Sequence, residues 1–517
     1  MRKMVTLVVA HLTLILGASA QVAVPAKPAQ GYPLWGDLKP GPYAVGFRVI
    51  QTYDYTRNYI PKVDFAGERA TGETARPMQI CIWYPAQAAG SAKRMTIEDY
   101  VALSGNELGV DAGSAERRAH IEKEFRLGPI APFFPNGVSD ADWARIRAIP
   151  TAAVRDAKPA AGKFPVAVHA MLGRMAQSVL LEFLASHGYV IAAVPSVGRS
   201  AAFWNRGEWS LTSVEAMMGD LAFVLGEALR QPFADGSRVA FIGAATTPAL
   251  LYQMRSMRAD AIAGIEGDVI EGHPAWDPAR VRVPLLEISS KDAPPSPTLL
   301  EGLKYAPRYL YRFPNQSHAD SYPFRRFAQP ERAAEQRTYS WSCLLVLQFL
   351  NATLKADAAA AQKLRATKQL GIDAGEVVAR FIEASAPVPT EDEFLTLIRR
   401  NQMDEAARVL SEVKQRDPNH RIATLDSMRT VCVFLRRDHG LPAAIAGYKM
   451  MLEVFPASGG AHSELANLYA AAGDRPMALE HYQRSLDLLE KDTTIEESAK
   501  APVREMIKQQ MERLRQT

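Results

Sequence analysis

The stretch that decides the fold is residues 238–251, which read Arg-Val-Ala-Phe-Ile-Gly-Ala-Ala-Thr-Thr-Pro-Ala-Leu-Leu. Residues 238–242 are a short apolar run that predicts a buried strand. Gly243 permits a tight turn, because glycine tolerates backbone angles that other residues avoid. Thr247 followed by Pro248 is typical of a helix N-cap with proline at the first helical position. The stretch therefore predicts a strand, a sharp turn and a helix in direct succession.

The same alternation of strands and helices extends on both sides of this stretch. Besides the strand at 238–242, we predict strands at 164–170, 189–195, 261–265, 283–289 and 308–313, and helices at 174–187, 213–229, 248–257 and 338–354. The strands are apolar throughout, as expected when helices cover both faces of a parallel sheet. We therefore predict an α/β domain with a mainly parallel sheet. Two paired strands, at 43–55 and 78–84, precede it.

Residues 90–162 interrupt this pattern within an α/β domain expected to span residues 40–360. Three helices are predicted in the interruption, at 97–103, 114–125 and 139–148, separated by loops that contain Gly and Pro. A helical insertion of this size beside a sheet is either a lid over a substrate pocket or a layer that covers an edge strand. The sequence leaves both possibilities open.

The N-terminal residues 1–20 have the pattern of a secretory signal. Arg2 and Lys3 precede an apolar run, and Ala18-Ser19-Ala20 is a small-residue site at which signal peptidase would cleave. A membrane anchor needs about twenty apolar residues, and this run is shorter. We therefore expect an exported protein, periplasmic or secreted, with cleavage near Ala20 and no membrane span. Residues 21–39 are rich in Pro, Gly and Ala and predict an extended lead-in.

Composition excludes several classes of function. The formal net charge is +4, falls to about +2 without the signal, and is not concentrated in a basic cluster, so nucleic acid is not an expected partner. The three cysteines, Cys81, Cys343 and Cys432, lie in apolar runs, which indicates buried thiols. No Cys or His residues cluster at metal-ligand spacing. We predict neither a metal site nor a cofactor.

The C-terminal third is helical in character. We predict linker helices at 361–390 and a repeat domain at 391–517. Ala444 and Tyr448 recur 34 residues later as Ala478 and Tyr482, which resembles the period and packing residues of tetratricopeptide repeats.

An earlier unit carries Ala406 at the corresponding position, 38 residues before Ala444, so a four-residue insertion is expected near residues 436–440. Three units and a capping helix at 495–515 would form a stable stack. Helical pairs unrelated to any family are the alternative.

The turn after strand 238–242 also has a chemical interpretation. Some hydrolases hold their nucleophilic serine on such a strand-to-helix turn, in the pattern Gly-x-Ser-x-Gly. Gly243 matches this pattern, but Ala245 stands at the serine position and Thr247 replaces the second glycine. A methyl group cannot attack a carbonyl carbon, so ordinary serine catalysis is not expected. Thr246 is a hindered substitute whose side chain should point away from a catalytic histidine.

Five further segments carry a resemblance to a known family. Residues 41–47, 76–86, 163–166, 184–192 and 349–357 resemble the framework of the platelet-activating-factor acetylhydrolase and dienelactone-hydrolase-like group of α/β-hydrolases. The resemblance covers about residues 40 to 360. It implies the α/β-hydrolase fold and catalytic residues in the chain order nucleophile, acid, histidine.

The resemblance also assigns roles to individual residues. It places the histidine at His318, the acid at Glu266 and the empty nucleophile position at Ala245. Asp292, after the next strand, is the alternative acid. The oxyanion-hole amides are expected at three positions: Met171, Leu172 and Thr246.

Two hypotheses about function follow, with a third possible. The favoured one is an exported, non-catalytic binding or assembly module, with an ester or lipid ligand in the hydrolase pocket and a protein or peptide partner at the repeats. The alternative is an active, serine-esterase-like hydrolase of esters or lipids that uses an unforeseen nucleophile, or a water activated by His318. In the third, the repeats carry the function and the hydrolase domain is only a scaffold.

Overall fold

The computed structural model describes the chain from Tyr32 onward, with interruptions. It does not describe residues 59–74, 89–91, most of 104–129, 135, 171–176, 194–210, 244–245, 257, 267–276, 294–301, 386–388, 493–495 and 517. The predicted signal peptide and most of the predicted helix at 114–125 lie outside the described residues. The chain divides into two compact units, Met1–Ser385 and Ala386–Thr517, and each is described by itself.

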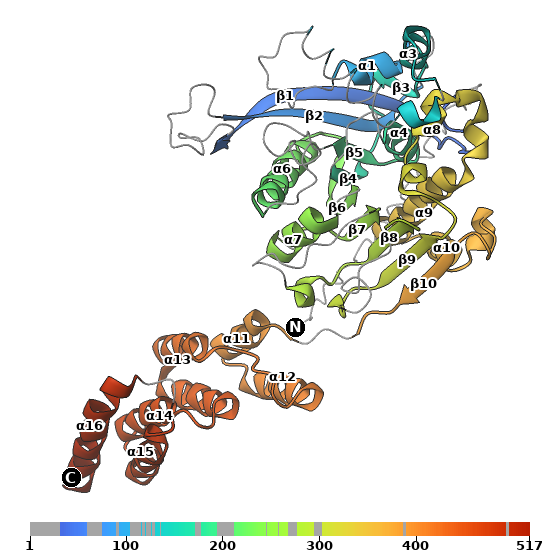
Figure 1. The fold of residues 1–517 in the computed structure, drawn as a ribbon. Helices are drawn as coiled ribbons and strands as arrows, with labels where there is room; N and C mark the ends of the chain where they lie inside the picture. Colours follow the sequence, from blue (N-terminus) through green and yellow to red (C-terminus); the bar gives the residue numbers. More distant parts are fainter. Residues whose placement is uncertain are drawn as a thin grey trace, which may run out of the picture. The chain divides into compact units, whose positions relative to one another are not determined.

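The first unit is built on a ten-stranded sheet in the order β10-β9-β8-β7-β6-β4-β5-β2-β1-β3 (Figure 1). Its strands are β1 (Ala44–Asn58), β2 (Ala75–Ala86), β3 (Ala153–Arg155), β4 (Phe164–Ala170), β5 (Val190–Ala193), β6 (Ala234–Gly243), β7 (Ala261–Ile265), β8 (Leu285–Ser290), β9 (Arg308–Phe313) and β10 (Val378–Ile382). Only β2 and β10 run antiparallel to their neighbours. The predicted α/β-hydrolase fold with a mainly parallel sheet is confirmed.

Helices cover both faces of this sheet. α4 (Ser178–Ser186) and α9 (Arg337–Leu354) pack on one face, while α6 (Leu211–Leu229) and α7 (Thr246–Ser256) pack on the other. Successive side chains of a strand point to opposite faces, so β6 contributes to both cores and is apolar throughout its second half. This two-sided burial is why the central strands read as continuous apolar runs.

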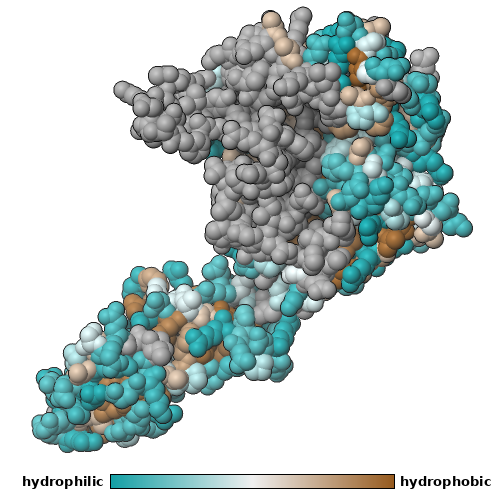
Figure 2. Space-filling model, viewed as in Figure 1, coloured by the Kyte–Doolittle hydropathy of each residue, from teal (hydrophilic) through white to brown (hydrophobic). Residues whose placement is uncertain are grey.

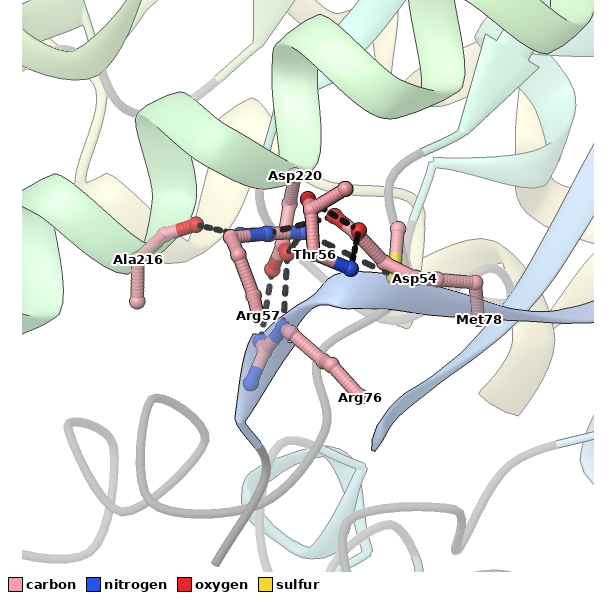
Figure 3. Close-up of polar contacts among 7 residues, drawn as sticks. All are labelled: Asp54, Thr56, Arg57, Arg76, Met78, Ala216 and Asp220. Atoms are coloured by element: carbon pink, nitrogen blue, oxygen red, sulfur yellow. Dashed lines mark hydrogen bonds and ion pairs between the residues drawn. The ribbon is translucent and has the colours of Figure 1, made fainter. Parts of the chain in front are cut away.

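The long hairpin of β1 and β2 is fixed to helix α6 by buried charges (Figure 3). Asp220 of α6 has a side chain that is 2% exposed, and both of its oxygens accept from Arg76, each at 2.7 Å. Arg57 donates to the same carboxylate at 2.7 Å and also contacts Asp54 at 2.6 Å. The hairpin and the helix are therefore held by a compact network of opposite charges.

A second buried carboxylate joins the N-terminal segment and the insertion to the sheet. Glu182 of α4 accepts hydrogen bonds from the Tyr100 hydroxyl at 2.6 Å, the Ala152 amide at 2.9 Å and the Trp35 indole at 3.5 Å. Burial raises the pKa of Glu182, although these hydrogen bonds oppose the shift. Trp35 is 1% exposed. The expectation of an extended lead-in is therefore wrong for residues 32–38, which form a turn packed into the core because of their large apolar side chains.

The described part of the insertion is not only helical. It contains α1 (Ile97–Val101), a 3-10 turn at Ala131–Phe133, α3 (Asp140–Arg147) and then β3. β3 pairs in parallel with β1 and becomes the edge of the sheet. In this part, the insertion extends and covers the sheet edge, which is the second of the two possibilities that the sequence left open.

The first unit continues beyond residue 360. After α9 come α10 (Ala358–Arg365), a 3-10 turn at Thr367–Leu370 and β10, which pairs antiparallel with β9. The prediction of linker helices throughout 361–390 is therefore wrong. β10 gave no strand signal because it is a largely exposed edge strand that includes Arg380.

The second unit is helical in its described residues. Its helices are α11 (Glu391–Arg399), α12 (Met403–Arg416), α13 (Leu425–Val454), α14 (Gly459–Ala471), α15 (Arg475–Leu489) and α16 (Glu497–Gln516). α13 consists of two helical segments joined at Gly440, where φ is +83°. This kink lies in the segment where the sequence predicted an insertion.

The small residues predicted to allow close helix packing are buried. Ala406, Ala444 and Ala478 are each fully inaccessible to solvent and belong to one apolar core. In the face drawn in Figure 2, hydrophilic residues cover most of the second unit and apolar residues show between them as smaller patches. Across the described part of the chain, no helix has the length and apolarity needed to cross a bilayer.

Candidate functional site

The junction between β6 and α7 is the predicted turn. β6 ends at Gly243, whose φ of +149° is rarely adopted by residues with a side chain, and α7 begins at Thr246. Ala245 lies between them, outside the described residues, and the Thr246 side chain is also not described. Met171 and Leu172 fall in the undescribed segment 171–176. The nucleophile position and the oxyanion amides therefore stay predictions.

The remaining predicted residues follow neighbouring parallel strands. β6, β7, β8 and β9 are adjacent, with Gly243 opposite Gly264, Ile265 opposite Ile288 and Ser290 opposite Phe313. Because the carboxyl ends of parallel strands share one edge, the loops after these strands open at the same edge as the β6–α7 turn. Ligands of open α/β sheets bind at this edge.

Glu266 and His318 meet at this edge. The Nδ1 atom of His318 lies 3.1 Å from Oε2 of Glu266. The Glu266 side chain is fully buried, whereas that of His318 is half exposed. The edge of the Tyr322 ring packs against the imidazole, with ring centres 5.2 Å apart. The carboxylate thus orients the imidazole, so proton transfer to a ligand would use the opposite nitrogen, Nε2.

Two serines that the sequence analysis did not single out complete the surroundings of Glu266. Ser290 donates to Oε2 at 2.9 Å, and Ser321 donates to Oε1 at 2.8 Å. Hydrogen bonds of this kind stabilise a buried carboxylate. A single serine has no sequence pattern that marks it as part of a site. Only the order of the strands along the chain could have suggested that Ser290 and Ser321 lie near Glu266.

The backbone at Glu266 is strained. Its φ is +58°, in the left-handed region that costs a residue with a side chain about 1–2 kcal/mol. The Glu266 amide donates to the carbonyl of Ile288 at 2.8 Å. Strained residues persist where the surroundings fix them and are concentrated at functional sites. The strain therefore adds to the reasons for regarding Glu266 as part of a site.

Asp292, the alternative acid, has a different contact. Its Oδ2 accepts a hydrogen bond from the backbone amide of His318 at 2.9 Å, and its own amide donates to Ser290 Oγ at 3.2 Å. The imidazole of His318 contacts Glu266 and not Asp292 in this arrangement. Asp292 thus contacts the backbone of His318, whereas Glu266 contacts its imidazole.

The surroundings of two other histidines, His169 and His187, suit a role in packing. His169, near the end of β4, is 1% exposed, and burial lowers its pKa to about 4, so it is uncharged at neutral pH. Among the residues that the structure describes, its Nε2 atom has no hydrogen-bond partner. His187 contacts the carbonyl of Lys39 at 3.1 Å, and burial lowers its pKa to about 4 as well.

The arrangement can accept and hold a proton. Within the residues that the structure describes, no group of three or more His, Cys, Asp or Glu side chains could hold a metal ion. The described chemistry is that of an imidazole oriented by a buried carboxylate. An acyl-enzyme would need a nucleophile that Ala245 does not supply.

Comparisons with known proteins add a likeness of fold. No protein-family model matches the chain, and no curated relative does either. Among solved structures, a ferulic acid esterase from Streptomyces cinnamoneus is similar, with 19% sequence identity and a TM-score of 0.45. The likeness covers 70% of this chain and 99% of that chain.

Proposed function

We propose that this chain is an exported α/β-hydrolase-fold protein that binds an ester or lipid ligand without turning it over. The single observation that carries the proposal is the contact between His318 and buried Glu266. The sequence predicts Ala245 in place of the serine at the same edge of the sheet. Loss of the nucleophile removes acyl-enzyme chemistry, since the other members of a triad cannot form the covalent intermediate. The remaining acid and base still provide a polar anchor for a carbonyl ligand.

The second unit supports a role in assembly. Its small residues at 34-residue spacing are buried between helices, as tetratricopeptide repeats require. Stacked helical pairs form extended concave surfaces that hold peptides or proteins. The proposal therefore includes a protein or peptide partner at residues 391–517. In the related third reading, these repeats carry the whole function and the first unit is a scaffold.

One observation favours a second candidate function, hydrolysis without a serine. The half-exposed imidazole of His318, backed by a buried carboxylate, is the arrangement a general base needs to activate a water molecule. In this candidate, His318 takes a proton from water as the water oxygen attacks an ester carbonyl. The bond between the acyl carbon and the alcohol oxygen then breaks, and the imidazolium returns the proton to the leaving alcohol, which leaves a carboxylic acid. Glu266 stabilises the imidazolium that forms.

A set of variants distinguishes the two candidates. The purified mature protein is incubated with short-chain nitrophenyl esters and with a fluorophosphonate probe, beside Ala245→Ser and the matched control Ala244→Ser. We expect no turnover and no labelling of the wild type or of Ala244→Ser, and labelling of Ala245→Ser that disappears in the double variant with His318→Ala. Wild-type turnover that is abolished by His318→Ala would instead establish the second candidate.

The export and assembly parts of the proposal have their own tests. After cell fractionation, the protein should be recovered from the periplasm or medium with Gln21 as its first residue. Recovery from the cytoplasm alone, with Met1 intact, would refute export. In pull-downs, the full chain should capture partners that a chain ending at Ser385 does not. Equal capture by both would place the partner surface on the first unit.

A further inference from the structure

Two histidines of the second unit face each other between adjacent helices. His462 of α14 and His481 of α15 have their Nδ1 atoms 2.9 Å apart, with ring centres 5.2 Å apart and planes inclined by 29°. The ring centres are much farther apart than the two nitrogens. The rings therefore meet edge to edge through their nitrogens, as in a direct imidazole–imidazole hydrogen bond. This contact has no part in the proposed function.

Such a contact requires a particular number of protons. One Nδ1 must carry a hydrogen and donate it, while the other must be unprotonated and accept it. Two neutral rings satisfy this condition. When both rings are protonated, two N–H groups point at each other and two positive charges lie at hydrogen-bond distance. The contact therefore holds the helices together only in its less protonated states.

The charges around the pair add to this repulsion. Lys449 from α13 and Arg484 from α15 both oppose a positive charge on the rings, and Glu480 from α15 favours one. Tyr469 of α14 stacks on His481 with ring centres 5.5 Å apart, and the Lys449 ammonium lies 5.7 Å from the centre of the Tyr469 ring. Two cations and one carboxylate act on the pair, so the surrounding charge disfavours binding of a second proton to the two rings.

Burial acts in the same direction. It is the largest cause that lowers the pKa of His462 to about 4, followed by the neighbouring His481 and Arg484, and it also lowers the pKa of His481. In the unfolded chain, each ring takes up a proton near its ordinary pKa of 6.5. The stabilisation from the pair is therefore complete above pH 6.5 and is lost as the pH falls towards 4.

We infer that the contact between His462 and His481 is an acid-sensitive latch that holds α14 against α15 at neutral pH and releases them when both rings are protonated. α14 and α15 form the last helical pair before α16, so release loosens the end of the second unit. The change needs no ligand and no movement of the first unit.

Hydrogen–deuterium exchange of the full chain, followed by mass spectrometry, tests the latch. Peptides from α14 and α15 are compared at pH 7.0 and pH 4.5 after correction for the intrinsic exchange rate. For a fully buried histidine whose pKa is lowered from 6.5 to about 4, going from pH 7.0 to pH 4.5 would reduce protection about a hundredfold. His462 and His481 are only partly buried. We therefore expect protection to fall about tenfold in the wild type.

Three variants complete the experiment. The double variant His462→Phe/His481→Phe should keep the same protection at both pH values, while His439→Gln, an exposed control in the same unit, should behave as wild type. If the double variant is unprotected at pH 7.0, His481→Gln replaces it, and the pH-dependent loss should then be clearly smaller than in wild type. Unchanged wild-type protection at pH 4.5, or a full loss in the variant used, would overturn the inference.

Discussion

Replacing Asp220 with asparagine should unfold the first unit at a markedly lower urea concentration. Asp220 accepts three hydrogen bonds from two guanidinium groups, two from Arg76 and one from Arg57. Asparagine has nearly the same volume but no charge. Its oxygen, placed where Oδ1 lies, can keep the bonds from Arg57 and from Nε of Arg76, while its N–H₂ group replaces the oxygen that accepts from Nη2 of Arg76. The change therefore removes the charge and one charged hydrogen bond.

The magnitude follows from the burial of the partners. A hydrogen bond to a charged group contributes about 1.5–3 kcal/mol, so the lost bond alone costs about that much, and the two remaining bonds weaken because their acceptor is no longer charged. Arg57 is 24% exposed and can regain water, whereas Arg76 is 7% exposed and cannot. We therefore expect a loss of about 3 kcal/mol, at the lower end of the range for breaking a buried ion pair.

Tryptophan fluorescence measures this loss for the first unit alone. All seven tryptophans of the chain precede residue 386, so the signal does not include the second unit. With a urea dependence of about 3 kcal/mol per molar, the midpoint should fall by about 1 M. The matched control is Glu227→Gln in the same helix, where Arg230 is largely exposed and the expected loss is below about 0.5 kcal/mol. A loss in Asp220→Asn no larger than in this control would refute the reasoning.

Three further predictions concern packing, backbone geometry and pH. Gly41→Ala should destabilise the first unit by about 2 kcal/mol or more, since a Cβ there would lie 2.2 Å from the backbone oxygen of Ser186. Its control is Gly226→Ala in α6, where a Cβ would meet open space, so this change should be neutral or stabilising by up to about 1 kcal/mol. Both are measured by the same tryptophan fluorescence. Glu182→Gln should cost about 2 kcal/mol, because an amide N–H₂ replaces one of the oxygens that accept hydrogen bonds. Because burial raises the pKa of Glu182, the contribution of this side chain to the free energy of unfolding is complete below pH 4.5 and is lost as the pH rises. The stability lost in Glu182→Gln should therefore be greater at pH 5 than at pH 8. An equal loss at both pH values, or a greater loss at pH 8, would contradict this. Gly440→Ala should destabilise the second unit by about 1–2 kcal/mol, measured by urea-dependent hydrogen exchange of α13, because alanine resists the positive φ.

The central strands were predictable because burial on both faces makes them apolar. The predicted bounds of β4, β7 and β9 match those in the structure. β6 begins at Ala234, four residues before the predicted start at Arg238. This start was missed because residues 235–237 are Asp, Gly and Ser and interrupt the apolar run, and residues 234–235 pair only with the start of β4. β10 was missed for the opposite reason, since an exposed edge strand needs no apolar run. Sequence patterns report burial, and they fail where a strand is not buried.

The candidate site was predictable only in part, for a topological reason. In a parallel sheet the loops after successive strands share an edge, so the chain order was enough to bring Glu266 and His318 together. The roles of Ser290 and Ser321 depend on which carboxylate oxygen each side chain reaches, and no spacing encodes that. The left-handed backbone at Glu266 could not be predicted either, because glycine is the residue that usually indicates this conformation in a sequence.

The edge strand β10 determines where the first unit can be separated from the second. β10 covers β9, and its Phe381 ring packs against Tyr309 and Tyr311, with ring centres 5.8 and 5.9 Å away. A chain cut at residue 360 would leave the main-chain groups of β9 that pair with β10 without partners and would uncover two tyrosines. Such an edge is a template on which other chains can add strands and aggregate. Proteolysis or engineering that spares residues up to Ser385 would keep β10 as the edge of the sheet, as in the full chain, whereas a shorter piece would be poorly soluble for reasons unrelated to its site.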